Sequence, residues 1–291
     1  MKSRLSRRNF AMLGSAGILS ARNARAQTGK LTARQAVERI QKTLAAAGVA
    51  WRAQTVDTFK AGDPDTPVTG IATTFMATLD ALQRSAAAGK NFVVTHEPTF
   101  WNHLDKTDEF HDDPIYKYKI DFIERHHLVV WRFHDHWHAR KPDAIYVGFN
   151  RAMGWDKYLV GEGLGSYRLP ETTLALLARD VRRQLKTRSL RIIGRPDLKV
   201  NKVAVGSHAL AANAERLRES DVILVPEARE WDSAEYLRDL VDSGANKAAL
   251  VLAHEQFEEW GMEDCATWLA GFIREAPVQW IPSGEPFWMP S

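Results

Sequence analysis

Cysteine is almost absent from the 291-residue sequence, which contains only Cys265. A single cysteine excludes an internal disulfide framework, so stability must come from a packed core or from bound metal. After the N-terminal region, no segment approaches the roughly twenty uninterrupted apolar residues that a membrane-spanning helix needs. We therefore expect a soluble mature protein that forms one large domain or two intertwined smaller ones.

Acidic residues are missing from the first 26 positions, which carry six basic residues. The basic start contains Arg7 and Arg8, a modest apolar run extends to Ile18, and positions 24–26 form a small-x-small cleavage site. This layout predicts a signal peptide over residues 1–26, and the arginine pair favours the twin-arginine (Tat) export machinery. We expect a periplasmic or secreted protein. The alternative is a basic amphipathic helix at the start of the mature chain.

The basic charge of the sequence is concentrated in this signal region. Without residues 1–26 the formal net charge changes from +3 to −3. A slightly negative protein has no general field that attracts nucleic acid or anionic lipid, and no RNP, helix-turn-helix or zinc-finger signature is present. We expect no nucleic-acid partner and no membrane contact for the mature form.

The remaining sequence, residues 27–291, has the pattern of an α/β protein. Short runs rich in Val, Ile or Leu alternate with longer periodic stretches, which is typical of helices packed on sheets. Predicted helices cover 31–48, 77–89, 114–127, 171–186, 209–219, 232–243 and 262–274. Predicted strands cover 68–74, 91–95, 128–133, 202–206, 221–225 and 248–253. The glycine-rich stretch 161–166 marks the predicted crossing between two halves.

Several predicted strands end directly in residue types that bind metals. His96 and Glu97 follow the second predicted strand, His134 follows the third, and His254 follows the last. A further strand leads through a proline into Glu227. Because α/β sheets place ligands at the carboxyl ends of their strands, these side chains are expected to share a site.

Two short motifs add further candidate ligands. Histidines alternate at His134, His136 and His138, and an extended backbone would project all three to one side. His136 could instead point into the sheet beneath. His254 and Glu258 are four residues apart, so one helical turn would place them on the same face. Imidazole nitrogen is the commonest biological ligand for first-row transition metals.

The remaining candidates receive ordinary structural interpretations. Isolated histidines commonly serve as polar surface or core groups, and we interpret these in that way: His103, His111, His126, His127 and His208. Large aromatic residues dominate cores, so core packing is favoured over an aromatic rim around a substrate for these tryptophans: Trp101, Trp131, Trp137 and Trp260. A solvated helix face is predicted for three acidic residues: Glu259, Glu263 and Asp264.

A series of motifs, in order, resembles the Nif-three-like dinuclear metal-centre proteins, also described as type 2 homologues of GTP cyclohydrolase I. The motifs are 68–74, 94–98, 134–138, 203–207, 226–227 and 254–258. The similarity runs over most of the chain after the signal region. It implies metal ligation by six residues: His96, Glu97, His134, His138, His254 and Glu258.

Two of these positions depart from the pattern of the family. Glu97 stands where the family usually has a histidine, and this adds negative charge. His138 replaces an aspartate that would help to bridge two ions, and a neutral imidazole has one free lone pair for one ion. Glu97 and Glu258 remain as candidate bridging carboxylates. We expect one or two divalent transition-metal ions, and the mixed nitrogen and oxygen ligands suit zinc, iron or manganese.

The resemblance also implies an architecture. Relatives have two interleaved α/β halves, with mixed sheets flanked by helices, and their sites face the inside of a ring-shaped hexamer. We therefore expect this fold class and a homo-oligomer.

The leading functional hypothesis is a metal-dependent hydrolase of a small-molecule substrate, with a metal-activated water as nucleophile. Glu227 is a candidate for accepting or delivering the proton, and His136 competes for that role. A phosphoester, a nucleotide or a cyclic amide would suit such a site. The cyclohydrolase description carries little weight because a fold does not determine a reaction.

The alternative is a periplasmic metal-binding or metal-delivery protein without turnover. A catalytic site leaves a coordination position open for water, whereas a structural site is closed by protein ligands. An amidohydrolase or metallo-β-lactamase motif at His134-x-His136 is a third interpretation, but the late His254 does not fit those patterns.

Export is expected to depend on the arginine pair. The double substitution Arg7→Lys with Arg8→Lys should leave precursor in the cytoplasm, because the Tat machinery reads both guanidinium groups. Cell fractionation and immunoblotting measure the outcome. Normal periplasmic delivery of the double variant would contradict the Tat prediction.

Overall fold

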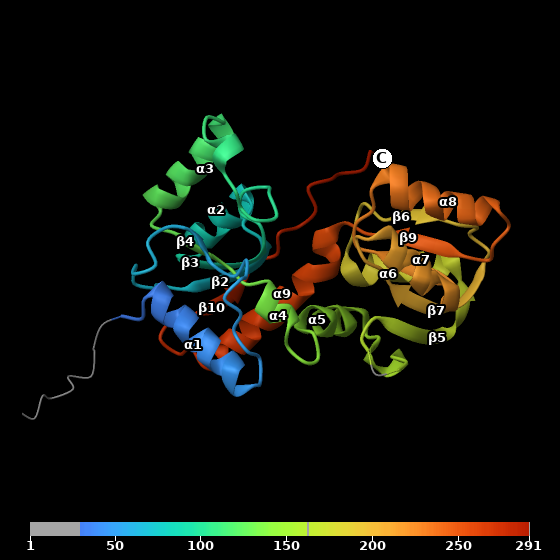
Figure 1. The fold of residues 1–291 in the computed structure, drawn as a ribbon, viewed down its shortest axis with the longest axis horizontal. Coiled ribbons are helices and arrows are strands. Elements are labelled where there is room, and N and C mark those ends of the chain that lie inside the picture. Colours follow the sequence, from blue (N-terminus) through green and yellow to red (C-terminus); the bar gives the residue numbers. More distant parts are fainter. Residues whose placement is uncertain (1–29, 162, 291) are drawn as a thin grey trace, which may run out of the picture.

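The computed structural model describes residues 30–161 and 163–290. The predicted signal peptide, residues 1–26, lies outside this part of the chain. The described residues form two five-stranded mixed sheets flanked by helices, so the predicted fold class is confirmed (Figure 1). No helix among them is both long and apolar enough to cross a bilayer.

The first half of the chain builds four strands of one sheet and the helices around it. Its strands are β1 (Phe59–Ala61), β2 (Ile71–Met76), β3 (Phe92–Glu97) and β4 (Val129–Arg132). Its helices are α1 (Ala33–Ala46), α2 (Leu79–Ala87), α3 (Pro114–Arg125), α4 (Asp135–His138) and α5 (Ala144–Met153), with short 3-10 turns η1 (Asp108–Phe110) and η2 (Asp156–Tyr158).

The second half builds the other sheet and then returns to the first. Its strands are β5 (Ser166–Thr173), β6 (Arg191–Ile193), β7 (Lys199–Val205), β8 (Val222–Val225), β9 (Ala248–Val251) and β10 (Val278–Trp280). Its helices are α6 (Leu174–Leu185), α7 (Leu210–Glu219), α8 (Glu235–Asp242) and α9 (His254–Ala270), and a π-helical turn η3 (Glu230–Ala234) precedes α8.

Both sheets have parallel central strands, with one antiparallel edge strand in the first sheet and two in the second. The first has the order β1-β4-β3-β2-β10, in which only β1 runs antiparallel to its neighbour. The second has the order β5-β7-β8-β9-β6, in which both edge strands run antiparallel to theirs. Strands β4, β8 and β9 are buried at every residue, and β8 and β9 accordingly have continuous apolar sequences.

The halves are interleaved through the C-terminal part of the chain. Helix α9 leaves β9 of the second sheet and lies between the two sheets (Figure 1). The chain then adds β10 to the first sheet, where Val278 pairs with Ile71. The Thr73 hydroxyl of β2 donates a 2.7 Å hydrogen bond to the Met262 carbonyl of α9. The first sheet is therefore completed only by a strand that follows the whole of the second sheet in the sequence.

The predicted helix over 262–274 has the wrong start, because α9 already begins at His254. Ten of its 17 residues are buried on several sides, which removes the one-faced periodicity on which the prediction relied. One of the buried residues is Glu259, so the predicted solvated face is also wrong at that position. The helix predicted over 171–186 begins later in the structure, at Leu174, because residues 171–173 complete strand β5.

The predicted extended backbone at 134–138 is also wrong, because these residues form the helical turn α4. The carboxylate of Asp57 accepts the backbone N–H groups of His134, Asp135 and His136, at 2.7, 3.0 and 2.9 Å. It thereby satisfies donors that an initiating helix leaves free. The turn places His134 and His138 on one face.

The buried position of Glu259 should make stability depend on pH. Burial raises the pKa of Glu259 to about 7, and the nearby Glu255 carboxylate adds to the shift. The folded state therefore retains a proton that the unfolded state loses, and stability falls as pH rises from about 4.5 through 7. At pH 8.5 Glu259→Gln should raise the free energy of unfolding by on the order of 3 kcal/mol, and at pH 4.5 by little.

Thermal unfolding of both proteins across this pH range measures the effect. Glu263→Gln is the matched control, since Glu263 lies on the same helix with a side chain that is 40% exposed. A pH-independent difference between Glu259→Gln and the parent would contradict the prediction.

Candidate metal centre

A cavity of about 810 Å³ lies where the carboxyl ends of the two sheets face each other. Glu97 and His134 line it from the first half of the chain. Glu227 and His254 line it from the second half, at the ends of β8 and β9. The structure thus brings together side chains from strand ends that the sequence singled out separately.

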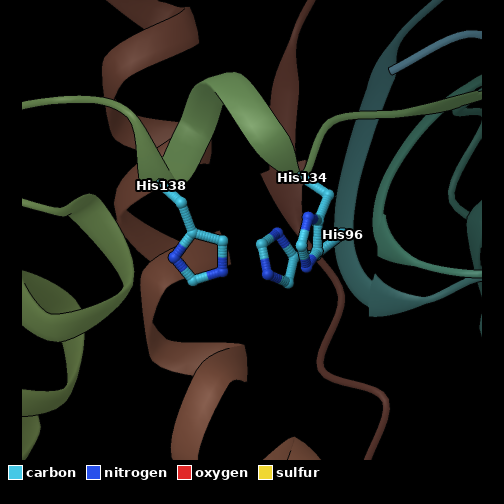
Figure 2. Close-up of side chains that lie close together, drawn as sticks. All are labelled: His96, His134 and His138. Carbon is cyan, nitrogen blue, oxygen red and sulfur yellow. The ribbon is translucent and has the colours of Figure 1, made fainter. Parts of the chain in front are cut away.

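Three imidazoles converge beside this cavity. His96 is the penultimate residue of β3, while His134 and His138 stand at the two ends of α4. Figure 2 shows their rings directed toward one another. The ring centroids are 4.6 to 4.9 Å apart. Each ring offers a ligand nitrogen within 4.8 Å of the other two, so one metal ion could contact all three.

Each of these rings is oriented by an oxygen atom on its Nδ1 side. The Nδ1 of His96 donates to the Phe133 carbonyl at 3.1 Å. The Nδ1 of His134 donates to its neighbour Asp135 at 3.1 Å, and that of His138 donates to Asp143 at 2.9 Å. These bonds set the tautomer that leaves Nε2 with a free lone pair, which is the usual arrangement around metal-binding histidines.

A second group of ligand atoms surrounds the buried carboxylate of Glu258. Its Oε2 lies 3.2 Å from Nε2 of His96 and 3.1 Å from Nε2 of His254. All three atoms are buried and make no hydrogen bond within the described residues. Buried polar atoms are normally satisfied, so this cluster has the donor atoms and the unmet demand of a cation site.

Glu97 joins the cluster through one of its two oxygens. The buried guanidinium of Arg132 donates to Oε2 of Glu97 at 3.0 Å and to the His96 carbonyl at 3.0 Å. Oε1 of Glu97 lies 3.5 Å from Nε2 of His134 and 4.0 Å from Nε2 of His254. Arg132 therefore directs a single carboxylate oxygen toward the imidazoles.

The charges of the site suit a divalent cation. Burial opposes ionisation of Glu258, yet His254 and His96 hold the pKa of its carboxyl well below its usual range. Burial also disfavours protonated His254, but Glu258, Glu227 and Glu97 outweigh it and raise the pKa of that imidazole to about 10. Burial and the neighbouring His96 and His138 lower the pKa of His134 to about 3, so this ring stays neutral. The carboxylates of Glu97, Glu227 and Glu258 therefore favour a positive charge beside them.

Glu227 contacts the back of the cluster from the cavity wall. Its Oε2 lies 3.3 Å from Nδ1 of His254 and 3.5 Å from Nδ1 of His208. His254 thus has the Glu227 carboxylate at Nδ1 and the Glu258 carboxylate at Nε2. His138 likewise has a carboxylate, that of Asp143, at its Nδ1. The interaction with His254 lowers the pKa of Glu227, which remains an ionised, largely exposed carboxylate.

His208 was interpreted as an ordinary surface or core histidine, and its side chain is 52% exposed at the cavity. It forms a third potential metal-binding group with Glu227 and His254, and it lines the cavity. Its position three residues after the end of β7 was the available signal, because the other ligands also follow strand ends. Asp57 and Asp143 were also missed, since their roles depend on contacts across the fold.

His136 lies apart from the three converging imidazoles. It is buried, its Nδ1 donates to Asp57 at 2.7 Å, and its Nε2 accepts the backbone N–H of Arg52 at 2.9 Å. Its ring stacks on Trp51 with centroids 3.7 Å apart. Both ring nitrogens are therefore engaged within the core, as expected if His136 pointed into the structure beneath.

The tryptophans near the ligands divide into two kinds. Trp131 and Trp137 are buried in the core, as predicted. Trp101 is 45% exposed and lines the cavity, so core packing was the wrong expectation for it.

Solved structures with the same fold cover almost the whole chain. A Bacillus cereus protein related to NIF3 is 14% identical, with a TM-score of 0.69, over 90% of this chain and 100% of that chain. The Staphylococcus aureus hypothetical protein SA1388 is 15% identical, with a TM-score of 0.67, over 90% and 100%. Reduced HcgD from Methanocaldococcus jannaschii is 15% identical, with a TM-score of 0.59, over 86% and 97%.

Curated proteins give no match to this chain. The family Duf34/NIF3 matches residues 35–282, which include every candidate ligand described above. Because this match covers well over half of the 291 residues, the chain belongs to the Duf34/NIF3 (NGG1p interacting factor 3) family.

Proposed function

We propose that this protein is a metal-dependent hydrolase of a small-molecule phosphoester, nucleotide or cyclic amide. The observation that carries the proposal is the convergence of buried, unpartnered ligand atoms at the edge of an open cavity of about 810 Å³. A bound divalent ion would supply Lewis acidity and lower the pKa of a water molecule toward neutrality.

The protein residues have separate roles in this proposal. His96, His134 and His138 would hold one ion. Glu97 and Glu258 form a further group with His96, and His254 lies 3.1 Å from Glu258, so Glu97, His254 and Glu258 would hold a second. Oε2 of Glu258 lies between His96 and His254, so it is the carboxylate placed to bridge the two positions. Zinc, iron and manganese all suit this mixture of nitrogen and oxygen ligands.

Glu227 is the residue that we propose as proton acceptor. It is ionised, faces the cavity and contacts His254, so it can take a proton from a nucleophile without leaving the site. His136 has no free ring nitrogen and is left out of this role.

Metal storage or delivery without turnover is the alternative function. A purely structural site would be enclosed by its protein ligands. His134, His254 and Glu97 instead line a cavity large enough for a small molecule, which supports catalysis over storage. Export to the periplasm and assembly into a ring-shaped homo-oligomer complete the proposal. The first rests on the signal-peptide pattern of residues 1–26 and the second on the family resemblance.

Removing one ligand should remove metal and stability together. His254→Ala should lower the metal content per chain and lower the melting temperature, because an ion bound only by the native state stabilises that state. Elemental analysis and thermal unfolding measure both quantities. The difference in melting temperature should shrink when both proteins are stripped by a chelator, because only the contacts of His254 with Glu258 and Glu227 then distinguish them. His111→Ala, at an exposed histidine, is the control. Full metal content in His254→Ala would rule out this ligand assignment.

The carboxylate behind His138 should tune metal affinity without touching the ion. Asp143→Asn should weaken zinc binding about 10- to 100-fold, because the imidazole loses the anionic acceptor on its Nδ1. Asparagine still caps α5, where Asp143 accepts the N–H of Ile145. Asp113→Asn is matched, since Asp113 caps α3 in the same way away from the site. Competition with a chromophoric chelator measures the affinities, and equal affinities for the two variants would contradict the assignment.

A further inference from the structure

The loop from Pro98 to Asp105, which follows the metal-ligand end of β3, is fixed by hydrogen bonds and an ion pair that involve buried side chains. The Asp105 carboxylate accepts the backbone N–H groups of Thr99 and Phe100, at 2.6 and 3.0 Å. The side chain of Asp105 is itself only 3% exposed. The start of the loop is therefore bound to the buried carboxylate at its end, that of Asp105.

Three cationic side chains contact the same loop. Lys119 of α3 donates to the Thr99 carbonyl, and Arg132 of β4 donates to the His103 carbonyl. Lys60 of β1 lies 3.3 Å from the Asp105 carboxylate. Arg132 also binds Glu97, so one guanidinium connects the loop to a candidate metal ligand. The position of the loop relative to the metal centre is thus determined by the core.

Trp101 occupies the centre of this loop with a backbone φ of +56°. A bulky side chain rarely adopts such a conformation, because its Cβ crowds the neighbouring carbonyl. Such strain persists only where the surroundings enforce it, and it concentrates at functional sites. Trp101 nevertheless leaves 45% of its surface exposed, so burial of the indole does not explain the strain.

The exposed indole lines the same cavity as Glu97, His134 and His254. Phe110 contacts Trp101 in an edge-on arrangement with ring centroids 5.5 Å apart, which supports the ring from the loop side. The cavity has a second exposed aromatic in Phe287, from the C-terminal segment. The cavity therefore presents aromatic surface, from Trp101 and Phe287, to a molecule that also contacts the candidate metal ligands.

We propose that Trp101 is the platform on which a planar aromatic ring of the substrate stacks. This inference rests on the proposed function and narrows its substrate class to molecules that join such a ring to the group that is hydrolysed. Offset stacking on an indole favours a planar π system over a saturated ring of equal size. Neither phosphate nor an aliphatic phosphoester would use this surface.

Two phosphonates that resist hydrolysis test the proposal on the zinc-loaded protein. Phenylphosphonate and cyclohexylphosphonate share the metal-binding group and differ in the planarity of the ring. Calorimetric titration should give about five-fold tighter binding of phenylphosphonate. Trp101→Gly, which accepts the positive φ, should bind the two phosphonates equally. Trp101→Phe should keep a preference, because it retains a planar ring at this position.

A control variant and the pattern of phosphonate affinities distinguish the role of Trp101 from the proposed hydrolase function. Trp231→Ala removes an exposed tryptophan outside the cavity and should leave the preference unchanged. Melting temperatures check that each variant is folded. Equal affinities in the parent protein, or a preference that survives Trp101→Gly, would overturn the role of Trp101 and leave the metal centre standing. Failure of both phosphonates to bind the zinc-loaded protein would overturn the phosphoester function together with this inference.

Discussion

The buried carboxylate of Glu258 is the group on which the rest of the site depends. It lies between Nε2 of His96, from the first sheet, and Nε2 of His254, which follows the second. An ionised carboxylate in a protein interior is costly unless positive charge compensates it. A cation at this position would therefore stabilise the contact between the two halves of the fold as well as supply reactivity. Helix α9 carries Glu258 and His254 together, so its path between the sheets brings the halves to one centre.

Buried acids and bases outside the ligand set determine the geometry of that centre. Asp57 accepts three successive backbone N–H groups and thereby starts the turn that aligns His134 with His138. Arg132 contacts Glu97, the His96 carbonyl and the loop that presents Trp101. The metal-binding side and the proposed substrate-binding side of the cavity thus share one buried guanidinium. A change at Arg132 would disturb both at once.

Much of the fold was predictable because most of its central strands are buried on both faces. The continuous apolar runs before His96, His134 and His254 correspond to β3, β4 and β9, and their carboxyl ends do meet at one cavity. Helix α9 was harder to predict, since a helix buried on several sides has no polar face to mark its period. The separation of His136 from its neighbours was equally hidden, because Asp57, far away in sequence, decides the conformation of that segment.

The sequence by itself determined the α/β class, the six strands β2, β3, β4, β7, β8 and β9, and the set of residues with metal-ligand chemistry, because apolar periodicity and residue type are local properties. The tertiary structure decided which ring nitrogen of each histidine is free, which oxygen of Glu97 faces the site, and that His208 and Trp101 border the cavity. These features depend on contacts between residues that are distant in sequence. Only the packing of two interleaved sheets around α9 brings those residues within hydrogen-bonding distance.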